Sequence, residues 1–560
     1  MPPEPAAIVQ GDRSVLVEVD HPGYERTREV LARFAEIEKS PEHIHTYRVS
    51  DLSLWNAAAA GMRPEEVLEG LRSISRYAVP THVEHEVMER MGRHGVCSLH
   101  DVPRDPQRLR LAVEHDLVHA RLASDRRAGK LLRSGPGGFT LAREDRGQIK
   151  QVLLRMGYPV ADHAGLVDGK PLDVALRSDV FSLYPYQRTA VRSFIESGGH
   201  GVVALACGGG KTVIALGAMA ELGTRTLVIV TGREAASQWK REIEAKTTVA
   251  AQDVALYDAR TKDVGPITIT SYSMLARRGG EGPTRHVHFD RLAGEGWGLI
   301  VYDEVHLLPA PVFRLTAELQ AHRRLGLTAT LVREDGRAGD VFALIGPKRF
   351  DVPWRELEAS GHIAEATCYE VRVELDPGLE AEYAAAPLAE QPRVAAGNPR
   401  KLEALEAIAG RHAGDRVLIF GTYLEPLQRA AKALGLPLIS GATPHTERER
   451  LYDAFRRGEL RSLALSRVGN FAIDLPDANV VVQLSGTMGS RQEEAQRLGR
   501  LLRPKPGGAR FYSLVTRDTV EQEHALRRQL FLVEQGYRFY IEDHEEGAKE
   551  GRNGGTGAGA

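Results

Sequence analysis

The sequence predicts an α/β protein in which two tandem parallel-sheet lobes follow small α+β accessory domains. Beyond Phe181, short apolar segments alternate with helical patterns, first as far as Leu327 and then again from Val417 to Leu484. Strands that are apolar on both faces are typical of a parallel sheet covered by helices on each side. A Pro- and Ala-rich passage around Pro377 to Pro399 separates the two series. We therefore expect two lobes of this kind.

The expected strands follow directly from these apolar runs. In the first lobe they are residues 201–206, 226–230, 267–270, 299–302 and 324–327, and in the second 417–420, 462–465 and 480–484. Near the amino end, a strand pattern over 14–19 and helical periodicity over 24–38 and 64–76 indicate a small α+β unit. A stretch rich in Arg, Asp and His follows, with the turn SGPGG at 134–138, and suits a compact accessory domain.

These patterns divide the chain into six expected parts. They are an amino-terminal α+β domain at 1–90, an accessory domain at 91–178, the first lobe at 179–376, a short linker at 377–400, the second lobe at 401–544 and a disordered tail at 545–560.

The composition is that of an ordinary soluble globular protein, with 42% hydrophobic and 26% charged residues and a formal net charge of −2. It excludes a collagen, a coiled coil or a largely disordered chain. No apolar run reaches the roughly 20 residues that a bilayer crossing needs, and the chain does not begin like a signal peptide. We expect a cytoplasmic protein without a membrane partner. The three cysteines, Cys97, Cys207 and Cys368, stand singly, so no zinc or disulfide framework is expected.

The strongest local motif is LACGGGKT at residues 205–212, which lies between an apolar strand and a helical pattern. Glycines let backbone N–H groups surround phosphate oxygens, Lys211 can reach the β and γ phosphates, and Thr212 can bind magnesium. The alternative is a Gly-rich turn with a surface lysine. The residues expected to bind ATP are Tyr184, Gln187, Cys207, Gly208, Gly209, Gly210, Lys211 and Thr212.

Two adjacent carboxylates follow a second buried strand. Asp303 and Glu304 end the run Ile300 to Tyr302, at the carboxyl edge where open α/β sheets bind ligands. Asp303 would hold Mg²⁺, and Glu304 would orient or deprotonate an attacking water. Adjacent acids at a solvated strand end are the alternative, which the lysine loop upstream in the same lobe makes less plausible.

Two further patterns suit a nucleoside triphosphate. Gln187 could pair with both N6 and N7 of adenine through its amide, although a turn with an exposed glutamine explains it as well. Gln496, Arg500 and Arg503 have spacings of four and three, so they share one helical face. As arginine fingers they would complete catalysis when the lobes close over ATP. A basic helix end with surface ion pairs is the alternative.

Together these motifs resemble superfamily 2 helicases, and the xeroderma pigmentosum group B (XPB) branch in particular. The resemblance is carried by LYPYQ, ACGGGKT, DEVH, LTAT at 327–330, the Arg-Glu-Asp element that follows it, SRVGNFAIDLP at 466–476 and QRLGRLLRP. It covers roughly 180–540, and segments near the amino end extend it over most of the chain. It implies two RecA-like lobes and a damage-recognition-like domain at about 91–178.

The resemblance also implies an activity: an ATP-dependent DNA helicase or translocase, 3′ to 5′, of the nucleotide excision repair type. Its cofactors would be ATP and Mg²⁺, and its partners single-stranded, forked or damaged duplex DNA and a structure-specific endonuclease. Residues for coupling and DNA contact would be His306, Thr328, Thr330, Arg333, Glu334, Asp335, Thr231, Arg233, Thr270, Ser271, Thr422, Gly469 and Asp474. Trp239 could stack on a base, but core packing suits it better.

Two other functions remain open from the sequence. An ATP-gated scaffold could open DNA and recruit a nuclease without processive unwinding, which the short, alanine-rich linker between Cys368 and Lys401 favours. An RNA helicase of the same superfamily is the other, and DEVH in place of DEAD argues against it.

Overall fold

The computed structural model consists of two compact units, Met1–Glu356 and Leu357–Ala560. It describes residues 5–40, 43–135, 137–277, 286–308, 312, 315–316, 319, 322–329, 338–466, 478–486, 494, 497–499, 501–502 and 508–544. The expected disordered tail at 545–560 lies outside these residues. None of the helices described is long and apolar enough to cross a membrane.

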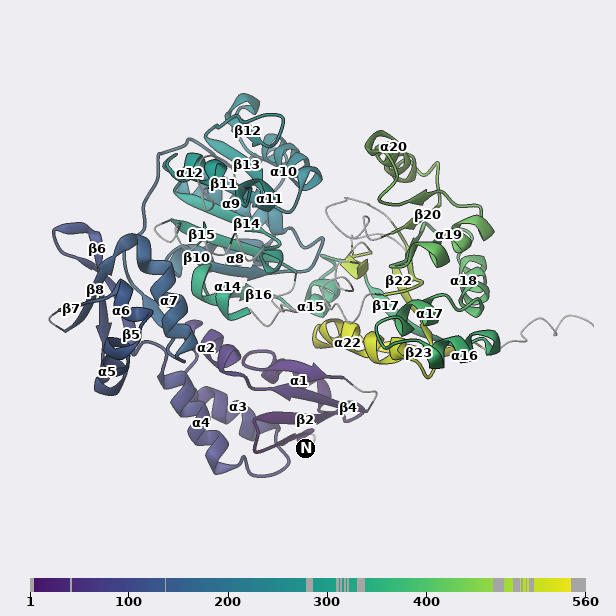
Figure 1. Ribbon diagram of the computed structural model, residues 1–560, viewed down its shortest axis with the longest axis horizontal. Helices are drawn as coiled ribbons and strands as arrows, with labels where there is room; N and C mark the ends of the chain where they lie inside the picture. The colour runs from purple at the N-terminus through teal and green to yellow at the C-terminus, as the bar shows by residue number, and fades with distance from the viewer. Residues whose placement is uncertain are drawn as a thin grey trace, which may run out of the picture. The chain divides into compact units, whose positions relative to one another are not determined.

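The first unit contains a parallel sheet that has seven strands among the described residues (Figure 1). In sheet order the strands are β12 (Val254–Tyr257), β13 (Ile267–Ser271), β11 (Thr226–Val230), β14 (Leu299–Asp303), β15 (Arg323–Thr328), β10 (His200–Ala204) and β16 (Lys348–Asp351). The helices between them are α8 (Pro185–Glu196), α9 (Lys211–Leu222), α10 (Arg233–Lys246), α11 (Tyr272–Leu275), α12 (Val287–Ala293) and α14 (Ala338–Leu344). The central strands are almost fully buried, which explains why their sequences are apolar on both faces.

The second unit is built on another parallel sheet with seven described strands. In order they are β19 (Leu438–Ile439), β20 (Ser462–Leu465), β18 (Val417–Phe420), β21 (Val480–Gln483), β22 (Ala509–Thr516), β17 (Ala366–Val373) and β23 (Phe539–His544). Its helices include α16 (Pro377–Ala385), α17 (Gln391–Ala396), α18 (Arg400–Arg411), α19 (Leu424–Ala433), α20 (His445–Arg456) and α22 (Val520–Glu534). The predicted fold class, two tandem RecA-like α/β lobes, is confirmed.

One expected boundary is wrong. Residues up to 376 were expected in the first lobe, but β17 pairs with β22 and β23 of the second sheet. The first unit ends at Glu356, within α15 (Trp354–Ala359). The sequence between Ala366 and Val373 has Thr367, Glu370 and Arg372 among its apolar residues, and so it did not resemble the other buried strands.

The amino-terminal domain has an antiparallel sheet in the order β1 (Ala7–Val9), β2 (Ser14–Glu18), β4 (Ile44–Arg48), β3 (Glu36–Lys39). Its helices are α1 (Tyr24–Leu31), α2 (Asp51–Ala59), α3 (Pro64–Ile74) and α4 (Thr81–Gly92). The helix expected over 24–38 is too long, because α1 ends at Leu31. The buried Ile37 pairs with Tyr47 in the sheet instead.

The accessory domain contains a five-stranded sheet, counted over the described residues. Its order is β7 (Arg133–Gly135), β8 (Gly138–Ala142), β6 (Asp105–Val113), β5 (Cys97–Val102), β9 (Val160–Asp162). The helices are α5 (Asp116–Ser124), α6 (Ala128–Leu131) and α7 (Arg146–Arg155). The domain contacts the first lobe through α7, where Gln151 Nε2 donates to Asp340 Oδ1 of α14 at 3.1 Å.

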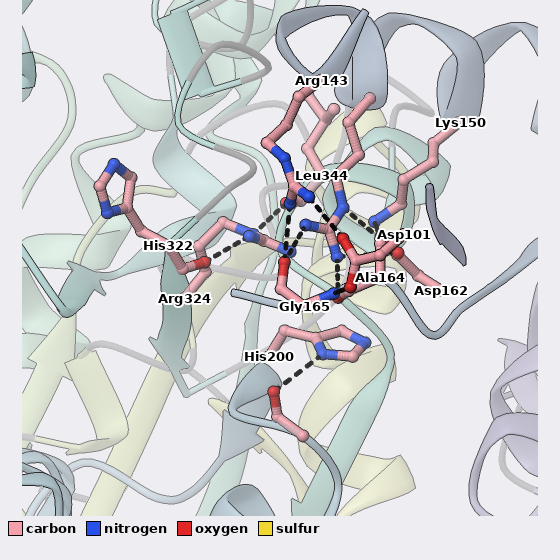
Figure 2. Close-up of polar contacts among 12 residues, drawn as sticks. Asp101, Arg143, Lys150, Asp162, Ala164, Gly165, His200, His322, Arg324 and Leu344 are labelled. Carbon is pink, nitrogen blue, oxygen red and sulfur yellow. Dashed lines mark hydrogen bonds and ion pairs between the residues drawn. The ribbon is translucent and has the colours of Figure 1, made fainter. Parts of the chain in front are cut away.

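A buried ion-pair cluster stabilises this side of the accessory domain (Figure 2). Arg146 donates from Nε and Nη2 to the two carboxylate oxygens of Asp162, at 3.0 and 2.8 Å. Lys150 Nζ donates to Asp162 Oδ2 at 3.1 Å. Burial raises the pKa of the Asp162 carboxyl, but Lys150 and Arg146 lower it more, and the result lies far below the ordinary value.

Replacing Asp162 by asparagine is expected to destabilise the first unit by about 3 to 5 kcal/mol, because two buried cations lose their carboxylate. Asp162 has a lowered pKa, so its contribution is present above the unfolded pKa of about 4 and is lost as the pH falls further. Urea denaturation followed by circular dichroism measures the change. The control is Asp168→Asn, because Asp168 is 89% exposed and pairs with Arg323 at the surface. Equal effects of the two substitutions would contradict the buried-pair argument.

Candidate nucleotide-binding site

The phosphate-loop motif lies between β10 and α9, as the sequence predicts. Gly208 and Gly210 have φ values of 86° and 85°, in the left-handed region that residues with a Cβ rarely adopt. A Cβ at Gly210 would lie 2.3 Å from Gln187 Nε2. Glycine is therefore required at 210 for both conformational and steric reasons, and helix α9 begins immediately afterwards at Lys211.

Gln187 contacts this loop from the start of α8. Its Nε2 donates to the carbonyl oxygen of Gly209 at 3.2 Å, and the Tyr186 hydroxyl donates to the same oxygen at 2.7 Å. Gln187 Oε1 accepts a hydrogen bond from the Tyr184 backbone N–H at 2.9 Å. Both ends of the amide are thus engaged within the chain, and the adenine pairing expected from the sequence would have to replace both bonds. Tyr184 itself is 51% exposed.

Lys211 and the two carboxylates lie together at the carboxyl edge of the sheet. Lys211 Nζ is 3.0 Å from Glu304 Oε1 and 3.9 Å from Cys207 Sγ. Asp303 is the last residue of β14, and Glu304 follows it in a left-handed conformation with φ 49°. Such a conformation costs free energy in a residue with a side chain, and it is a recurrent feature of functional sites. Here it accompanies the ion pair between Glu304 and Lys211.

The charges at this site perturb one another. Burial lowers the pKa of Lys211, but the neighbouring Cys207, Glu304 and Asp303 raise it by more, so the ammonium is charged. Burial and the adjacent Glu304 raise the pKa of Asp303 to about 6. Burial also raises the pKa of Glu304, yet Lys211 and His306 lower it below its ordinary value. Glu304 is therefore ionised, and Lys211 neutralises its charge. Asp303, in contrast, titrates close to neutral pH.

Two aromatic residues that the motifs did not reveal hold Asp303. Trp239 of α10 donates from Nε1 to Asp303 Oδ2 at 2.9 Å, and the Tyr272 hydroxyl donates to the Asp303 carbonyl at 2.7 Å. Trp239 is 2% exposed, so the interpretation as a core residue is confirmed. Its polar role depends on the packing of α10 beside β14, for which the sequence contains no signal.

His306 connects the carboxylates with the next strand. Its Nδ1 lies 2.6 Å from Thr328 Oγ1 at the end of β15 and 3.5 Å from Glu304 Oε2. Both His306 and Thr328 are buried. The structure thus joins Lys211, Glu304, His306 and Thr328 in one continuous polar chain.

The residues expected along a nucleic-acid track in the first lobe differ in accessibility. Arg233 is exposed, 3.7 Å from Asp258, and Thr231 and Ser271 are partly exposed at strand ends. Thr270 is 1% exposed, and its hydroxyl donates to the Tyr257 carbonyl at 2.9 Å. The Thr270 hydroxyl is therefore engaged between β12 and β13, and a phosphate contact near Thr270 stays a prediction.

Other expected residues belong to the second unit or lie outside the described residues. In the second unit the Thr422 N–H donates to Ser485 Oγ at 3.0 Å. The expected residues outside the described part of the chain are Thr330, Arg333, Glu334, Asp335, Gly469, Asp474, Gln496, Arg500 and Arg503.

The donor set fits Mg²⁺ bound together with nucleotide phosphates. Asp303 presents a carboxylate at the strand end, and Thr212 follows Lys211 in the first turn of α9. Mg²⁺ prefers one or two such oxygen ligands together with phosphate and water, rather than an all-protein cage. The described residues contain no cluster of three or more His, Cys, Asp or Glu suited to a metal.

Two parallel-sheet lobes, with a lysine loop after one strand and paired carboxylates after another, define a helicase-type enzyme that uses ATP. The particular family follows from sequence comparison. Residues 357–554 match the family described as ERCC3/RAD25/XPB C-terminal helicase, 180–333 match type III restriction enzyme, res subunit, and 7–134 match a helicase conserved C-terminal domain. The chain belongs to the XPB helicase family.

Relatives from three organisms extend over almost the whole chain. It is 47% identical to the "DNA 3'-5' helicase XPB" of Mycobacterium tuberculosis, over 96% of this chain and 98% of the relative. It is 46% identical to the protein of the same name from Kineococcus radiotolerans, over 96% of each. It is 32% identical, over 97% of this chain and 82% of the relative, to the "General transcription and DNA repair factor IIH helicase/translocase subunit XPB" of Antonospora locustae.

Proposed function

We propose that this chain is an ATP-driven DNA helicase or translocase that moves 3′ to 5′ and acts in nucleotide excision repair. The observation that carries the proposal is the cluster of Lys211, Glu304 and Asp303 at the carboxyl edge of the first sheet, with a 3.0 Å ion pair between the first two. The names of relatives that match almost the full length support DNA as the substrate and 3′ to 5′ as the direction.

ATP binding would rearrange this ion pair. Lys211 would exchange the Glu304 carboxylate for the β and γ phosphates, which carry more negative charge. Glu304 is then released to orient the attacking water and accept its proton. In the absence of nucleotide the lysine neutralises the catalytic base, so the base becomes active only when a triphosphate occupies the loop.

The oxygens of Asp303 and Thr212 would hold Mg²⁺ beside the phosphates. A bound Mg²⁺ supplies positive charge to the β and γ oxygens during phosphoryl transfer. Trp239 and Tyr272 fix Asp303 from the protein side. Cys207 and the glycines at 208–210 would surround the phosphates with backbone N–H groups, and Tyr184 and Gln187 would lie at the other side of the loop.

The second lobe would complete the site. Gln496, Arg500 and Arg503 share one face if their segment is helical, and the arginines would stabilise charge on the transferring phosphoryl group when the lobes close. Hydrolysis would release them, so that each ATP drives one cycle of closing and opening. The motif spacing and the family resemblance support this role of the second lobe.

The polar chain from Glu304 through His306 to Thr328 would carry the state of the nucleotide toward bound DNA. Beyond Thr328 the chain continues to Thr330 and to the Arg-Glu-Asp element at 333–335, which we propose to act at the point of strand separation. DNA phosphates would contact backbone amides and hydroxyls near Thr231, Arg233, Ser271 and Thr422, which is a recognition independent of sequence. Gly469 and Asp474 belong to the corresponding second-lobe motif.

The alternative is an ATP-gated scaffold that opens DNA and recruits a structure-specific endonuclease. One observation favours it. The linker expected at 377–400 forms two short helices, and the Tyr383 hydroxyl accepts a hydrogen bond from the Val520 N–H at 2.8 Å. The linker is thus bound to its own lobe, which supports the scaffold.

Strand displacement on a duplex with a 3′ tail separates the two functions. The helicase predicts ATP-dependent displacement from a 3′ tail and much less from a 5′ tail. Strong DNA-stimulated ATP turnover without displacement from either tail would favour the scaffold, and stimulation by RNA instead of DNA would contradict both.

Replacing Trp239 by phenylalanine tests how Asp303 is held. A hydrogen bond to a charged group contributes about 1.5 to 3 kcal/mol, so we expect the Mg²⁺ concentration for half-maximal ATP turnover to rise about tenfold or more. Trp297→Phe is the matched control, because Trp297 is equally buried but donates to the Leu292 carbonyl in the core. An unchanged Mg²⁺ requirement in the Trp239 variant would contradict the positioning role.

A further inference from the structure

A cavity of about 230 Å³ lies where the accessory domain meets the first lobe. Its lining is partly apolar and includes the Asp162 carboxylate, together with five basic or imidazole side chains: His94, Lys150, His163, His200 and Arg349. They come from the end of α4, from α7 and the segment after β9, and from β10 and β16. His200 is the first residue of β10, whereas the phosphate loop follows its last residue. The cavity therefore lies at the opposite edge of the sheet from the nucleotide site.

Arg349 is a cation held by neutral groups. Its Nε donates to the His200 carbonyl at 3.1 Å, and its Nη1 donates to the Ala59 carbonyl at 2.9 Å. Its Nη2 lies 3.4 Å from the His200 ring nitrogen. Within the described part of the chain, no carboxylate lies within 4 Å of this guanidinium. Burial lowers the pKa of Arg349 to about 10, which still leaves it charged near neutral pH.

Lys150 shares its carboxylate with an arginine. Asp162 is bound through both oxygens by Arg146, and Lys150 Nζ bonds to one of the same oxygens. The side chains of Arg146, Lys150 and Asp162 are 1%, 6% and 2% exposed. Burial, together with the nearby Arg324 and Arg146, lowers the pKa of Lys150 to about 8, although Asp162 opposes them. Two cations thus share the Asp162 carboxylate, and Figure 2 shows Lys150 beside it.

Two of the imidazoles, His200 and His94, add hydrogen-bond donors without adding charge. Burial, together with Lys150 and Arg324, lowers the pKa of His200 to about 3, and burial with Arg349 lowers the pKa of His94. Each ring is neutral near pH 7, and a neutral imidazole still has one N–H donor. His163 is exposed and stacks on His100, with ring centroids 5.3 Å apart. The cavity thus offers donors from several directions.

We propose that this cavity binds a small phosphate-type oxyanion that bridges the accessory domain and the first lobe. A cation that is partly removed from water is stabilised by a nearby anion, and a doubly charged anion in this cavity would contact both Arg349 and Lys150. A guanidinium and an ammonium are the groups that bind phosphate most strongly, and the imidazoles suit its remaining oxygens. Because its ligands come from both sides, an occupied site would strengthen the docking of the accessory domain on the motor.

Calorimetric titration of the full chain with inorganic phosphate, in chloride buffer at constant ionic strength, tests the proposal. The Lys211→Ala chain is titrated as well, so that phosphate bound at the nucleotide site is recognised. We expect one phosphate site to persist in Lys211→Ala and its affinity to fall about tenfold or more in Arg349→Gln. Arg349→Lys, which retains the charge, should recover part of the loss, and the exposed Arg192→Gln should leave the affinity unchanged.

The sources of the anion are distinguished by a second titrant. Binding of glycerol 3-phosphate as tight as that of phosphate identifies a phosphomonoester as a fitting ligand, and binding of phosphate alone identifies the free ion. No phosphate binding in Lys211→Ala, or equal affinity in the Arg349→Gln and unmodified chains, would overturn the proposal. If Arg349→Gln does not fold, selenate soaked into crystals of the unmodified chain decides by anomalous scattering. A peak beside Arg349 supports the site, and a peak only beside Lys211 overturns it.

Discussion

Glu304→Gln is expected to reduce ATP turnover about 10³-fold while ATP binding is retained. The amide has nearly the shape of the carboxylate but cannot accept a proton. It also removes the 3.0 Å ion pair with Lys211, which in the unmodified chain competes with the nucleotide for the lysine. We therefore expect ATP to bind Glu304→Gln at least as tightly as the unmodified chain. Steady-state phosphate release and equilibrium binding of a fluorescent ATP analogue measure the two quantities.

Lys211→Ala is the companion of this experiment, since it should lose both binding and turnover. The exposed Glu234→Gln at the start of α10 controls for a change of carboxylate to amide near the site. Turnover in Glu304→Gln within a few-fold of the unmodified chain would show that another group is the base. Weaker ATP binding in Glu304→Gln would contradict the competition between Glu304 and the nucleotide.

Arg500→Ala is expected to lower ATP turnover on the order of 10³-fold, with ATP affinity largely unchanged. An arginine finger contributes mainly in the transition state, when charge moves onto the transferring phosphoryl group and its leaving oxygen. The first lobe has Lys211 but, in the described part of the site, no arginine in an ion pair with Asp303 or Glu304. We propose that Arg500 of the second lobe supplies positive charge on the far side of the γ phosphate.

The measurement for Arg500→Ala is turnover at saturating ATP and DNA, with ATP affinity determined separately. Arg527→Ala is the matched control, because Arg527 is also in the second unit but is 61% exposed and pairs with Glu523. Turnover should stay within about twofold in that control, as expected for an exposed ion pair. Unchanged turnover in Arg500→Ala would remove this residue from the catalytic site.

The parts of the fold that the sequence predicts are those with a strong local signal. The strands at 226–230 and 417–420 are buried on both faces, so every residue in them except Thr226 is apolar, and they lie where expected. Strand β17 has polar residues among its apolar ones, and it joins the second sheet through long-range pairing with β22 and β23. Ile37 could belong to a helix or a strand by its periodicity, and its pairing with Tyr47 decides between them.

The candidate site shows the same division. Lys211, Asp303 and Glu304 are found from short motifs because each motif follows its strand directly, and parallel strands end at one edge of the sheet. Trp239 reaches Asp303 from a helix 64 residues away, and no motif indicates that approach. Thr270 has the residue type of a phosphate contact, but the pairing of β12 with β13 buries its hydroxyl.

The central claim is that ATP hydrolysis by the Lys211 and Glu304 site is coupled to DNA. The most direct test is ATP turnover by the unmodified chain with and without 3′-tailed DNA, at one moderate salt concentration. We expect DNA to raise ATP turnover by about tenfold or more, because bound DNA favours the closed and catalytically complete state of the lobes. Turnover that is the same with DNA, with RNA and without nucleic acid would contradict it.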